Sequence, residues 1–297
     1  MFKTMEAGMV NWWLRMQAGV VIVSNRLPLS VKKVDGKLEF HSSVGGLATG
    51  LSFYTKNKHN KWIGWPGISS DEVNEDEKLE IATELAKHNC YPVFLTKNQL
   101  DNYYSGYSNE ILWPLFHNMP LANNWNEDYW KAYRAVNSAF AEAVLALSGG
   151  NDTIWVHDYQ LLLLPDMLRT QRPSAQIGFF LHIPFPSVDA FADLPQAQSL
   201  LAGILGADLV GFHTSGYSDN FLDCCQQLKI GEVKSEQVQI GERQVGVHEF
   251  PMGIDYNKFA DAAQKQSVQK HLRRFRRQTA GRKVILTVDR LDPTKGF

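Results

Sequence analysis

The sequence predicts a doubly wound α/β domain, in which helices cover both faces of a mostly parallel sheet. Short, nearly continuous apolar runs recur along the chain, as is typical of parallel strands buried on both faces. Helical patterns lie between these runs, as in repeated βαβ units. The 297 residues, 44% hydrophobic and 21% charged, are enough for a large core and exclude a disordered, collagen-like or simple coiled-coil chain.

The apolar runs are the expected strands, and the helical patterns that separate them are the expected helices. The strands are predicted over Val20 to Ser24, Thr153 to His157, Ile177 to His182, Asp208 to His213 and Lys283 to Val288. The helices are predicted over Asp128 to Leu147, Leu161 to Gln171, Gln198 to Ala207 and Ser218 to Leu228. Gly149 and Gly150 act as a stop signal for the first of these helices.

Two stretches have the pattern of β-hairpins rather than of βα units. Asp35-Gly36 lies between short runs of mixed polarity within Val31 to Phe40, which is a hairpin signal. The stretch from Ile240 to Phe250 repeats this pattern around Gly241 to Arg243.

The domain organisation changes near Gly253. We expect an N-terminal extension over 1–19, a Rossmann-like domain over 20–253, a helical linker over 254–282, and the first strand and loop of a second, incomplete domain over 283–297. A basic cluster at the end of the linker and the start of the next segment is either a solvated helix face or an anion-contacting surface. Its members are Arg273, Arg274, Arg276, Arg277, Arg282 and Lys283.

Charge and cysteine content exclude several kinds of protein. Thirty basic and thirty-one acidic residues give a net charge of -1, which argues against a general nucleic-acid binder. Cys90, Cys224 and Cys225 suit neither a disulfide framework nor a metal site, so a cytoplasmic location is expected. The apolar stretch from Met9 to Ser24 contains polar residues and no clear cleavage site, so we expect neither a signal peptide nor a membrane span.

Candidate ligand-binding residues follow the predicted strands, because ligands of open α/β sheets bind beyond the carboxyl ends of the strands. Arg26 follows the first strand and could hold a phosphate with its planar donor fork, or could pair with a carboxylate. Gly45 and Gly46 precede a helical pattern, where bare backbone can approach an anion; a plain turn is the alternative. The chain has no G-x-G-x-x-G and no phosphate-loop motif, which argues against an ordinary dinucleotide oxidoreductase or ATPase.

His157, Asp158 and His182 lie at the ends of two further strands and are expected to face the same crevice. Aspartate can accept hydrogen bonds from two sugar hydroxyls, and histidine can bind a hydroxyl or carry a proton. Structural hydrogen bonding is the plainer alternative for each. His-Asp also occurs in metal-dependent phosphohydrolases, but those need further ligands on helices.

Aromatic and basic residues complete the candidates. Trp65, Tyr104 and Trp113 could contact a pyranose ring or a phosphate, although a place in the core or its rim explains most aromatic residues. Arg290 and Lys295 follow the last predicted strand, five residues apart. They could neutralise a diphosphate leaving group, or belong to a solvated charged loop.

In this order, the motifs resemble the retaining trehalose-6-phosphate synthase family. The match runs from about Val20 to Phe297, and HDYQLL followed by GFFLHIPFP is its most specific part. The segments that carry it are Val23 to Leu27, Gly45 to Gly50, Ile63 to Gly67, Tyr103 to His117, Trp155 to Leu162, Ile177 to Pro186, Gly211 to Thr214 and Arg290 to Gly296.

The resemblance implies a GT-B glycosyltransferase that transfers glucose from a nucleotide sugar, usually UDP-glucose, to glucose 6-phosphate with retention. It implies no cofactor and no metal, no nucleic-acid or membrane partner, and leaves a homo-oligomer open. The C-terminal domain of the fold would be truncated here, so that this chain alone would be inactive.

The resemblance also implies a role for each candidate residue. Arg26 and Tyr104 would hold the acceptor phosphate, and Trp113 and Trp65 would line the acceptor pocket. Gly45 and Gly46 would lie in a loop at the donor diphosphate. The remaining roles are those of Asp158 at acceptor hydroxyls, His182 near the reacting carbon of the donor sugar, and Arg290 with Lys295 at the departing diphosphate.

One departure and two alternatives remain. Pro293 stands where the family more often has tyrosine, which weakens the case for the usual acceptor. A related transferase with another acceptor, such as glycerol phosphate, is the nearest alternative. A regulatory homologue that has lost catalysis is the other.

Overall fold

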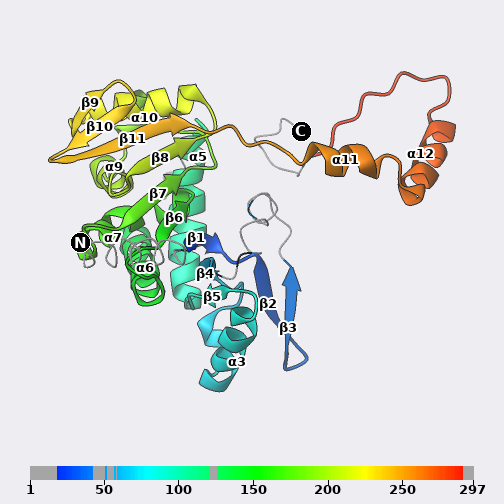
Figure 1. Ribbon diagram of the computed structural model, residues 1–297, viewed down its shortest axis with the longest axis horizontal. Coiled ribbons are helices and arrows are strands. Elements are labelled where there is room, and N and C mark those ends of the chain that lie inside the picture. Colours follow the sequence, from blue (N-terminus) through cyan, green and yellow to red (C-terminus); the bar gives the residue numbers. More distant parts are fainter. Residues whose placement is uncertain (1–18, 43–50, 52–56, 58, 121–125, 290–297) are drawn as a thin grey trace, which may run out of the picture. The chain divides into compact units, whose positions relative to one another are not determined.

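The computed structural model describes residues 19–42, 51, 57, 59–120 and 126–289 of the chain (Figure 1). Two compact units divide the chain, Met1–Pro251 and Met252–Phe297. The first unit contains all described strands. The second contains the helices α11 (Tyr256–Ala262) and α12 (Gln266–Gln278).

A nine-stranded sheet forms the centre of the first unit, in the order β5-β4-β1-β6-β7-β8-β11-β10-β9. All neighbouring pairs from β5 to β11 are parallel, whereas β10 pairs antiparallel with β11 and with β9. The strands are β1 (Val20–Arg26), β4 (Lys61–Trp65), β5 (Cys90–Pro92), β6 (Thr153–His157), β7 (Gln176–Phe180), β8 (Leu209–Phe212), β9 (Glu232–Lys234), β10 (Gln237–Ile240) and β11 (Arg243–Glu249).

Helices and short helical turns connect the strands. Those of the first unit are η2 (Ser70–Glu72), α3 (Glu75–Ala86), α4 (Lys97–Gln99), the π-helix η3 (Leu100–Leu112), α5 (Trp113–Phe116), α6 (Glu127–Leu147), η4 (Tyr159–Leu161), α7 (Leu164–Gln171), α8 (Val188–Phe191), α9 (Ala197–Ile204) and α10 (Ser215–Gln227). Two of their N-termini show why they begin where they do. The Asn74 and Glu77 side chains form a capping box at α3, and Asn126 accepts a hydrogen bond from the Asp128 N–H at α6.

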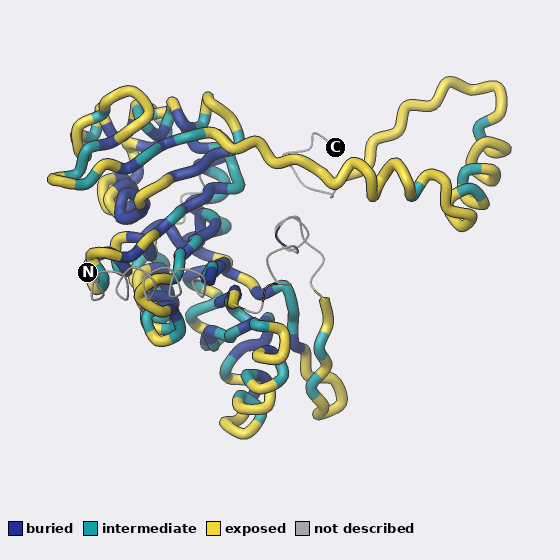
Figure 2. The backbone as a smooth tube through the Cα atoms, in the orientation of Figure 1, coloured by how far each residue is buried: buried dark blue, intermediate teal, exposed yellow. Residues whose placement is uncertain are grey.

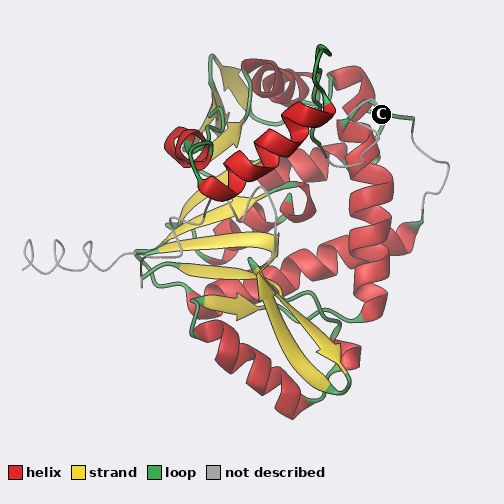
Figure 3. Ribbon diagram, turned by 90° about the vertical axis from the view of Figure 1, so that its right-hand side faces the viewer, coloured by secondary structure: helices red, strands yellow, loops and turns green. Residues whose placement is uncertain are grey.

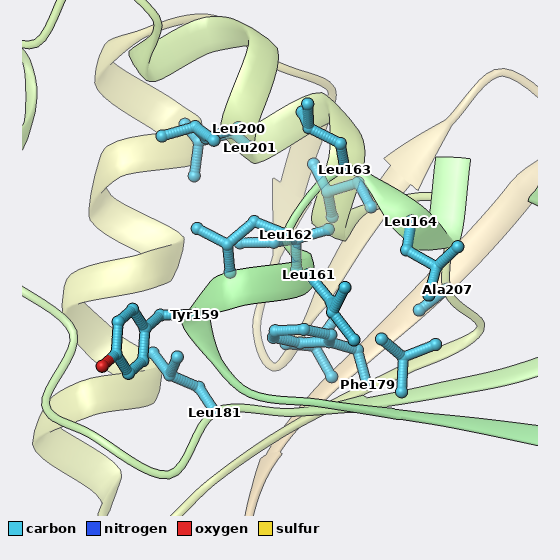
Figure 4. Packing of buried hydrophobic residues seen from close by; sticks show 14 of the residues in the cluster. Tyr159, Leu161, Leu162, Leu163, Leu164, Phe179, Leu181, Leu200, Leu201 and Ala207 are labelled. Carbon is cyan, nitrogen blue, oxygen red and sulfur yellow. The ribbon is translucent and has the colours of Figure 1, made fainter. Parts of the chain in front are cut away.

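Side-chain alternation along the strands produces a hydrophobic core on each face of the sheet. In β1, Val21 and Val23 belong to the larger core, which α6, α7, α9 and α10 cover, while Ile22 belongs to the smaller core with Ile81 and Leu85 of α3. The buried segments follow the strands and the inner sides of these helices (Figure 2). Figure 4 shows part of the larger core, where leucines after β6 pack against leucines of α9. Helices on both faces confirm the predicted doubly wound fold.

Strand β1 lies at the point where the strand order reverses. It pairs with β4 on one side and with β6 on the other, and the chain fills first one half of the sheet and then the other (Figure 1). Such a switch point leaves a crevice beyond the carboxyl ends of the two strands. The fold therefore places the ends of β1 and β6 where ligands of α/β proteins bind.

Both predicted hairpins are present. β2 (Leu29–Val34) and β3 (Lys37–Ser42) form a separate two-stranded sheet around Asp35-Gly36 (Figure 3). The second hairpin is β10 with β11, and β11 also joins the parallel sheet beside β8.

The predicted strands and helices of the first unit are confirmed, with small changes at their ends. The strand expected over 283–288 is wrong, because residues 283–289 have no regular secondary structure. A strand needs a hydrogen-bonded neighbour, and Ile285 and Leu286 are exposed instead. β4, β5, α3 and the π-helix were not predicted from the sequence. No helix in the described ranges is long and apolar enough to cross a membrane.

Asp208 joins two strands of the sheet at the start of β8. One carboxylate oxygen accepts a hydrogen bond from the Ile177 N–H at 2.8 Å, and the other lies 2.5 Å from Nη2 of Arg169. Arg169 also donates to the carbonyl groups of Gly206 and Ala175. The pair therefore ties α7 to the loops before β7 and β8.

We expect Asp208→Asn to lower the free energy of unfolding by about 1 to 2 kcal/mol, because Arg169 loses its charged partner where it is only 11% exposed. The control is Glu84→Gln, which removes an exposed pair with Lys87 and should cost less than about 0.5 kcal/mol. Urea unfolding of the three proteins measures both effects. Equal effects of the two substitutions would contradict this role of Asp208.

Candidate functional site

The candidate site is built on the carboxyl ends of β1, β6, β7 and β8. These strands are consecutive neighbours in the sheet, so the residues that follow them meet at one edge. The π-helix adds aromatic side chains. The structure describes six of the ten residues predicted for the site: Arg26, Trp65, Tyr104, Trp113, Asp158 and His182.

A β-bulge shapes the end of β1. Between the pairs Val23–Ile63 and Arg26–Trp65, β1 contains one residue more than β4. The Ser24 hydroxyl donates to the carbonyl of Arg26 at 2.8 Å and accepts a hydrogen bond from the buried indole N–H of Trp62 at 2.7 Å. Bulges often redirect a side chain beside a functional site, and here the bulge immediately precedes the exposed side chain of Arg26.

Arg26 lies over the aromatic face of Trp65, with Cζ 4.7 Å from the ring centroid. The indole N–H of Trp65 donates to the carbonyl of Ile68 at 2.9 Å, which fixes the ring beneath the guanidinium. Gly67 adopts φ +91°, and a Cβ there would lie 3.3 Å from Nη2 of Arg26. The guanidinium makes no ion pair with any residue that the structure describes. Its donors are therefore available to an anion, and the alternative of a carboxylate partner finds no support.

The π-helix links the ends of β1 and β6. The buried hydroxyl of Tyr103 donates to Oδ1 of Asn25 at 3.0 Å. Burial raises the pKa of Tyr103 well above its usual value, and the nearby Tyr159, Tyr104 and Asp158 raise it further. Tyr103 therefore remains a neutral hydrogen-bond donor, and its neighbours show that Asn25, Tyr104 and Asp158 lie in one region.

Tyr104 and Trp113 project from the π-helix and its end with half-buried side chains packed against the larger core. The Trp113 ring lies 4.3 Å from that of His117, whose Nδ1 is 2.7 Å from the Trp113 carbonyl oxygen. Gly106 is required within this helix, because a Cβ would meet the Tyr129 ring at 2.6 Å. Long π-helical segments are uncommon and are often found at functional sites.

Tyr133 and Asn137 of α6 support the loop after β6, and neither residue was predicted from the sequence. The Tyr133 hydroxyl donates to the Tyr159 carbonyl at 2.7 Å and accepts from the Leu162 N–H at 3.0 Å. The Asn137 amide donates to the Gln160 carbonyl at 3.0 Å. An asparagine in the apolar stripe of a helix was the available signal, because a buried polar group needs partners.

Asp158 has an unusual backbone conformation, with φ +76° and ψ 168°. Non-glycine residues rarely adopt this region and pay about 1 to 3 kcal/mol for it. Its N–H donates to the Phe180 carbonyl at 2.8 Å, and Oδ1 accepts from the N–H groups of Tyr159 at 3.0 Å and His182 at 3.2 Å. Within the described residues Oδ2 accepts no hydrogen bond, so it can accept one from a ligand.

Three histidines lie at the ends of adjacent strands: His157 is the last residue of β6, and His182 and His213 follow β7 and β8. Nδ1 of His157 lies 3.0 Å from Nε2 of His182, and the rings of His182 and His213 are 5.6 Å apart. The Phe180 ring lies against both His182 and His213. Gly211 makes room for it, because a Cβ there would meet the Phe180 ring at 2.7 Å.

Burial dominates the electrostatics of this end of the sheet. It raises the pKa of the Asp158 carboxyl to about 6, although the hydrogen bonds from Tyr159 and His182 oppose the shift. Burial lowers the pKa of His182 to about 4, with a further contribution from His213, and lowers the pKa of His157 well below its usual value. Near neutral pH the carboxylate is therefore mostly charged and both imidazoles are neutral.

Gly45, Gly46, Arg290 and Lys295 lie outside the described residues, so their predicted roles are neither supported nor contradicted. Within the described part of the chain, no group of three or more histidine, cysteine, aspartate or glutamate side chains is arranged to hold a metal ion.

Residues 18–297 match the sequence model of glycosyltransferase family 20. The chain is 42% identical over 285 residues to the 56 kDa subunit of the UDP-forming α,α-trehalose-phosphate synthase of Saccharomyces cerevisiae, a match that covers 93% of this chain and 57% of the yeast protein. The chain spans about half the length of the curated relatives it matches.

Solved structures similar to the chain include two from Candida albicans and Escherichia coli. The N-terminal domain of Candida albicans trehalose-6-phosphate phosphatase has a TM-score of 0.79 at 30% identity, over 90% of this chain and 55% of that one. An Escherichia coli structure described as trehalose-6-phosphate bound with UDP-2-fluoro glucose has a TM-score of 0.69 at 28% identity, over 88% of this chain and 54% of that one.

The backbone of Asp158 generates the first prediction from the site. We expect Asp158→Gly to be more stable than Asp158→Ala by about 1 to 2 kcal/mol, because both lose the same carboxylate but only glycine adopts φ +76° without strain. Urea unfolding of the two variants measures the difference. As a control, the same two substitutions at Asp76, a surface position inside α3, should favour alanine. An equal stability of the two Asp158 variants would show that this conformation carries no strain.

The shifted pKa values generate a second prediction. His182 has a lowered pKa, so its contribution to stability is complete above pH 6.5 and is lost as the pH falls toward 4. Asp158 has a raised pKa, so the fold gains stability as this carboxyl takes up a proton between pH 6 and 4. Between pH 7 and 5 we expect the free energy of unfolding of wild type relative to His182→Asn to fall by about 1 to 2 kcal/mol.

Asp158→Asn is the matched control, and the corresponding change in the free energy of unfolding is expected to have the opposite sign. Relative to Asp158→Asn, the wild-type free energy of unfolding should rise by about 1 kcal/mol over the same interval. Urea unfolding of the three proteins at both pH values provides the measurement. Trends of the same sign for both variants would contradict the buried environment described for these two side chains.

Proposed function

The chain belongs to glycosyltransferase family 20, and we propose that it forms the acceptor-binding half of an α,α-trehalose-phosphate synthase. The reaction transfers glucose from UDP-glucose to glucose 6-phosphate with retention and releases trehalose 6-phosphate and UDP. The observation that carries this proposal is the guanidinium of Arg26, which is fixed over Trp65 at the switch point and has no carboxylate partner among the described residues.

Arg26 and Tyr104 would bind the phosphate of the acceptor. The planar fork of arginine suits two phosphate oxygens, and the bulge in β1 immediately precedes this exposed side chain. Trp65 and Trp113 would offer apolar faces to the pyranose ring. A sugar phosphate fits such a set better than a free sugar, which would leave the arginine without a charged partner.

Asp158 would bind hydroxyl groups of the acceptor. The backbone N–H groups of Tyr159 and His182 already occupy Oδ1, and Oδ2 accepts no hydrogen bond from a described residue. A pKa of about 6 keeps this carboxyl mostly ionised at pH 7 to 8, so it accepts hydrogen bonds strongly. His182 would lie against the donor sugar near the reacting carbon.

The donor diphosphate would meet residues outside the described ranges. We propose that the loop with Gly45 and Gly46 approaches it, and that Arg290 and Lys295 neutralise the charge that develops as UDP leaves. These two cations would supply that stabilisation without a metal ion. This chain spans about half the length of the relatives, and transfer would need the second half that they have. The 297 residues alone would bind the acceptor weakly and would not convert it.

The domain of Candida albicans trehalose-6-phosphate phosphatase favours a second candidate. The match covers nine-tenths of this chain at 30% identity. The same fold therefore occurs at the start of a protein named as a phosphatase. In that case the site would bind a sugar phosphate without transferring glucose. A transferase that uses another acceptor, such as glycerol 3-phosphate, is the remaining alternative.

Binding of glucose 6-phosphate tests the acceptor site. We expect Arg26→Ala to raise the Kd about 10- to 100-fold, the effect of losing a charge-assisted hydrogen bond of about 1.5 to 3 kcal/mol. Calorimetric or NMR titration of this chain measures it, with Arg134→Ala on the exposed face of α6 as the control that leaves the Kd unchanged. An unchanged Kd for Arg26→Ala would remove Arg26 from the site, and tighter binding of glycerol 3-phosphate would replace the proposed acceptor.

Transfer assays separate the enzyme from the binding domain. If the reading frame continues beyond Phe297, we expect the longer protein to release UDP from UDP-glucose only when glucose 6-phosphate is present, and to keep that activity in EDTA. A longer protein that binds glucose 6-phosphate but releases no UDP would favour the second candidate. Activity that EDTA abolishes and only a divalent ion restores would contradict the metal-free leaving-group stabilisation.

A further inference from the structure

We propose that His157 is a positioning residue that holds His182 in the tautomer with its proton on Nδ1, so that His182 presents an N–H donor to the sugar ligand. The identity of that ligand rests on the proposed function. The hydrogen bond between the two histidines does not, and it is tested separately below.

The two imidazoles are joined by one hydrogen bond. Nδ1 of His157 lies 3.0 Å from Nε2 of His182, and the His157 side chain is completely buried. Burial lowers the pKa of both groups, so each ring carries a single proton near neutral pH. One nitrogen of the pair must then donate and the other accept, which leaves two possible arrangements.

The second nitrogen of His157 distinguishes the two arrangements. Nε2 of His157 is buried and has no hydrogen-bond partner among the described residues. If His182 donated, Nε2 of His157 would carry a proton and leave a buried N–H unpaired. If His157 donates, Nε2 carries only a lone pair. Orphaned buried N–H groups are rarer than under-satisfied acceptors, so the structure favours His157 as the donor and His182 Nε2 as the acceptor.

Aromatic neighbours hold both rings in place. The Trp155 ring lies 4.5 Å from that of His157, and the Phe180 ring lies 4.7 Å from that of His182. The ring centroid of His213 lies 5.6 Å from that of His182. A hydrogen bond between rings confined in this way fixes both orientation and tautomer, as do the partners of catalytic and metal-binding histidines in general.

The arrangement determines what His182 can offer to a ligand. Its Nε2 is occupied by His157, and no described residue hydrogen-bonds its Nδ1. With the proton on Nδ1, His182 donates to a ligand oxygen, and the nearby Asp158 accepts from a ligand hydroxyl. Under the proposed function, the N–H of His182 meets the donor sugar and the carboxylate of Asp158 meets the acceptor, so the tautomer of His182 affects the orientation of the donor sugar and not the binding of the acceptor.

Asparagine and glutamine at position 157 provide a matched pair of variants. The side-chain amide of asparagine can take the place of Nδ1, so His157→Asn keeps a donor toward His182. The amide of glutamine reaches the place of Nε2, so His157→Gln does not. Both variants are polar and neutral, and a difference between them therefore reports the hydrogen bond rather than the loss of the ring.

Long-range ¹H–¹⁵N NMR of the imidazoles in this chain at pH 7.5 tests the hydrogen bond directly, with His182→Asn used to assign the His182 signals. We expect His182 Nδ1 to be protonated and Nε2 to be unprotonated in wild type and in His157→Asn, and an averaged mixture of tautomers in His157→Gln. A proton on Nε2 of His182 in wild type would overturn the proposal, and this measurement needs no variant at position 157 to fold.

Kinetics of the longer protein test the consequence. We expect His157→Gln to lower kcat at least 10-fold with an unchanged Kd for glucose 6-phosphate, and His157→Asn to restore most of kcat. Equal kcat values for both variants would overturn the positioning role. A wild-type protein that releases no UDP would overturn the proposed function instead, and the NMR result would still decide the hydrogen bond.

Discussion

The pairing of β1 with both β4 and β6 is the constraint on which the rest of the structure depends. Because β1 is hydrogen-bonded on both sides, its carboxyl end opens at the centre of the sheet and not at an edge. Chain segments far apart in the sequence must then meet there. Asn25 accepts from Tyr103, and Asp158 accepts from the backbone of His182. A slip of any of these strands by one residue would turn the side chains away from the crevice.

The polar groups at this end of the sheet are costly to bury, and the fold satisfies nearly all of them. Tyr133 holds the loop after β6 by both donating and accepting. Asp158 adopts a strained backbone conformation that three hydrogen bonds maintain. Groups held in this way keep their orientation before a ligand arrives, which reduces the entropy lost on binding. Nε2 of His157 is buried without a hydrogen-bond partner among the described residues, and it identifies the tautomer of the histidine pair.

The sequence predicted the parts of the structure that follow from local pattern. Continuous apolar runs indicated the strands, and the rule of strand ends then indicated Arg26, Asp158 and His182, which the structure brings to one end of the sheet. The sequence did not predict the π-helix, because that conformation depends on packing against α6. Tyr103 lies against Tyr133, and Gly106 lies against the Tyr129 ring. The strand expected over 283–288 was wrong because apolar character alone does not supply a pairing partner. The tautomer of His182 depends on the buried Nε2 atom of His157, and the sequence pattern gives no signal for it.

A near-neutral net charge is compatible with the proposed anion site, because binding depends on the position of a few cationic groups and not on their total number. A protein with a net charge of -1 attracts no polyanion over long range, yet the Arg26 guanidinium over the Trp65 ring, which has no carboxylate partner among the described residues, offers a strong local contact. Selectivity then comes from what surrounds that charge. Asp158 repels a second phosphate near the sugar hydroxyls, and neutral His182 adds no positive charge that would attract one. Under the proposed function, the arrangement would therefore favour a ligand with a phosphate at one end and hydroxyls at the other, which is the chemistry of a hexose phosphate.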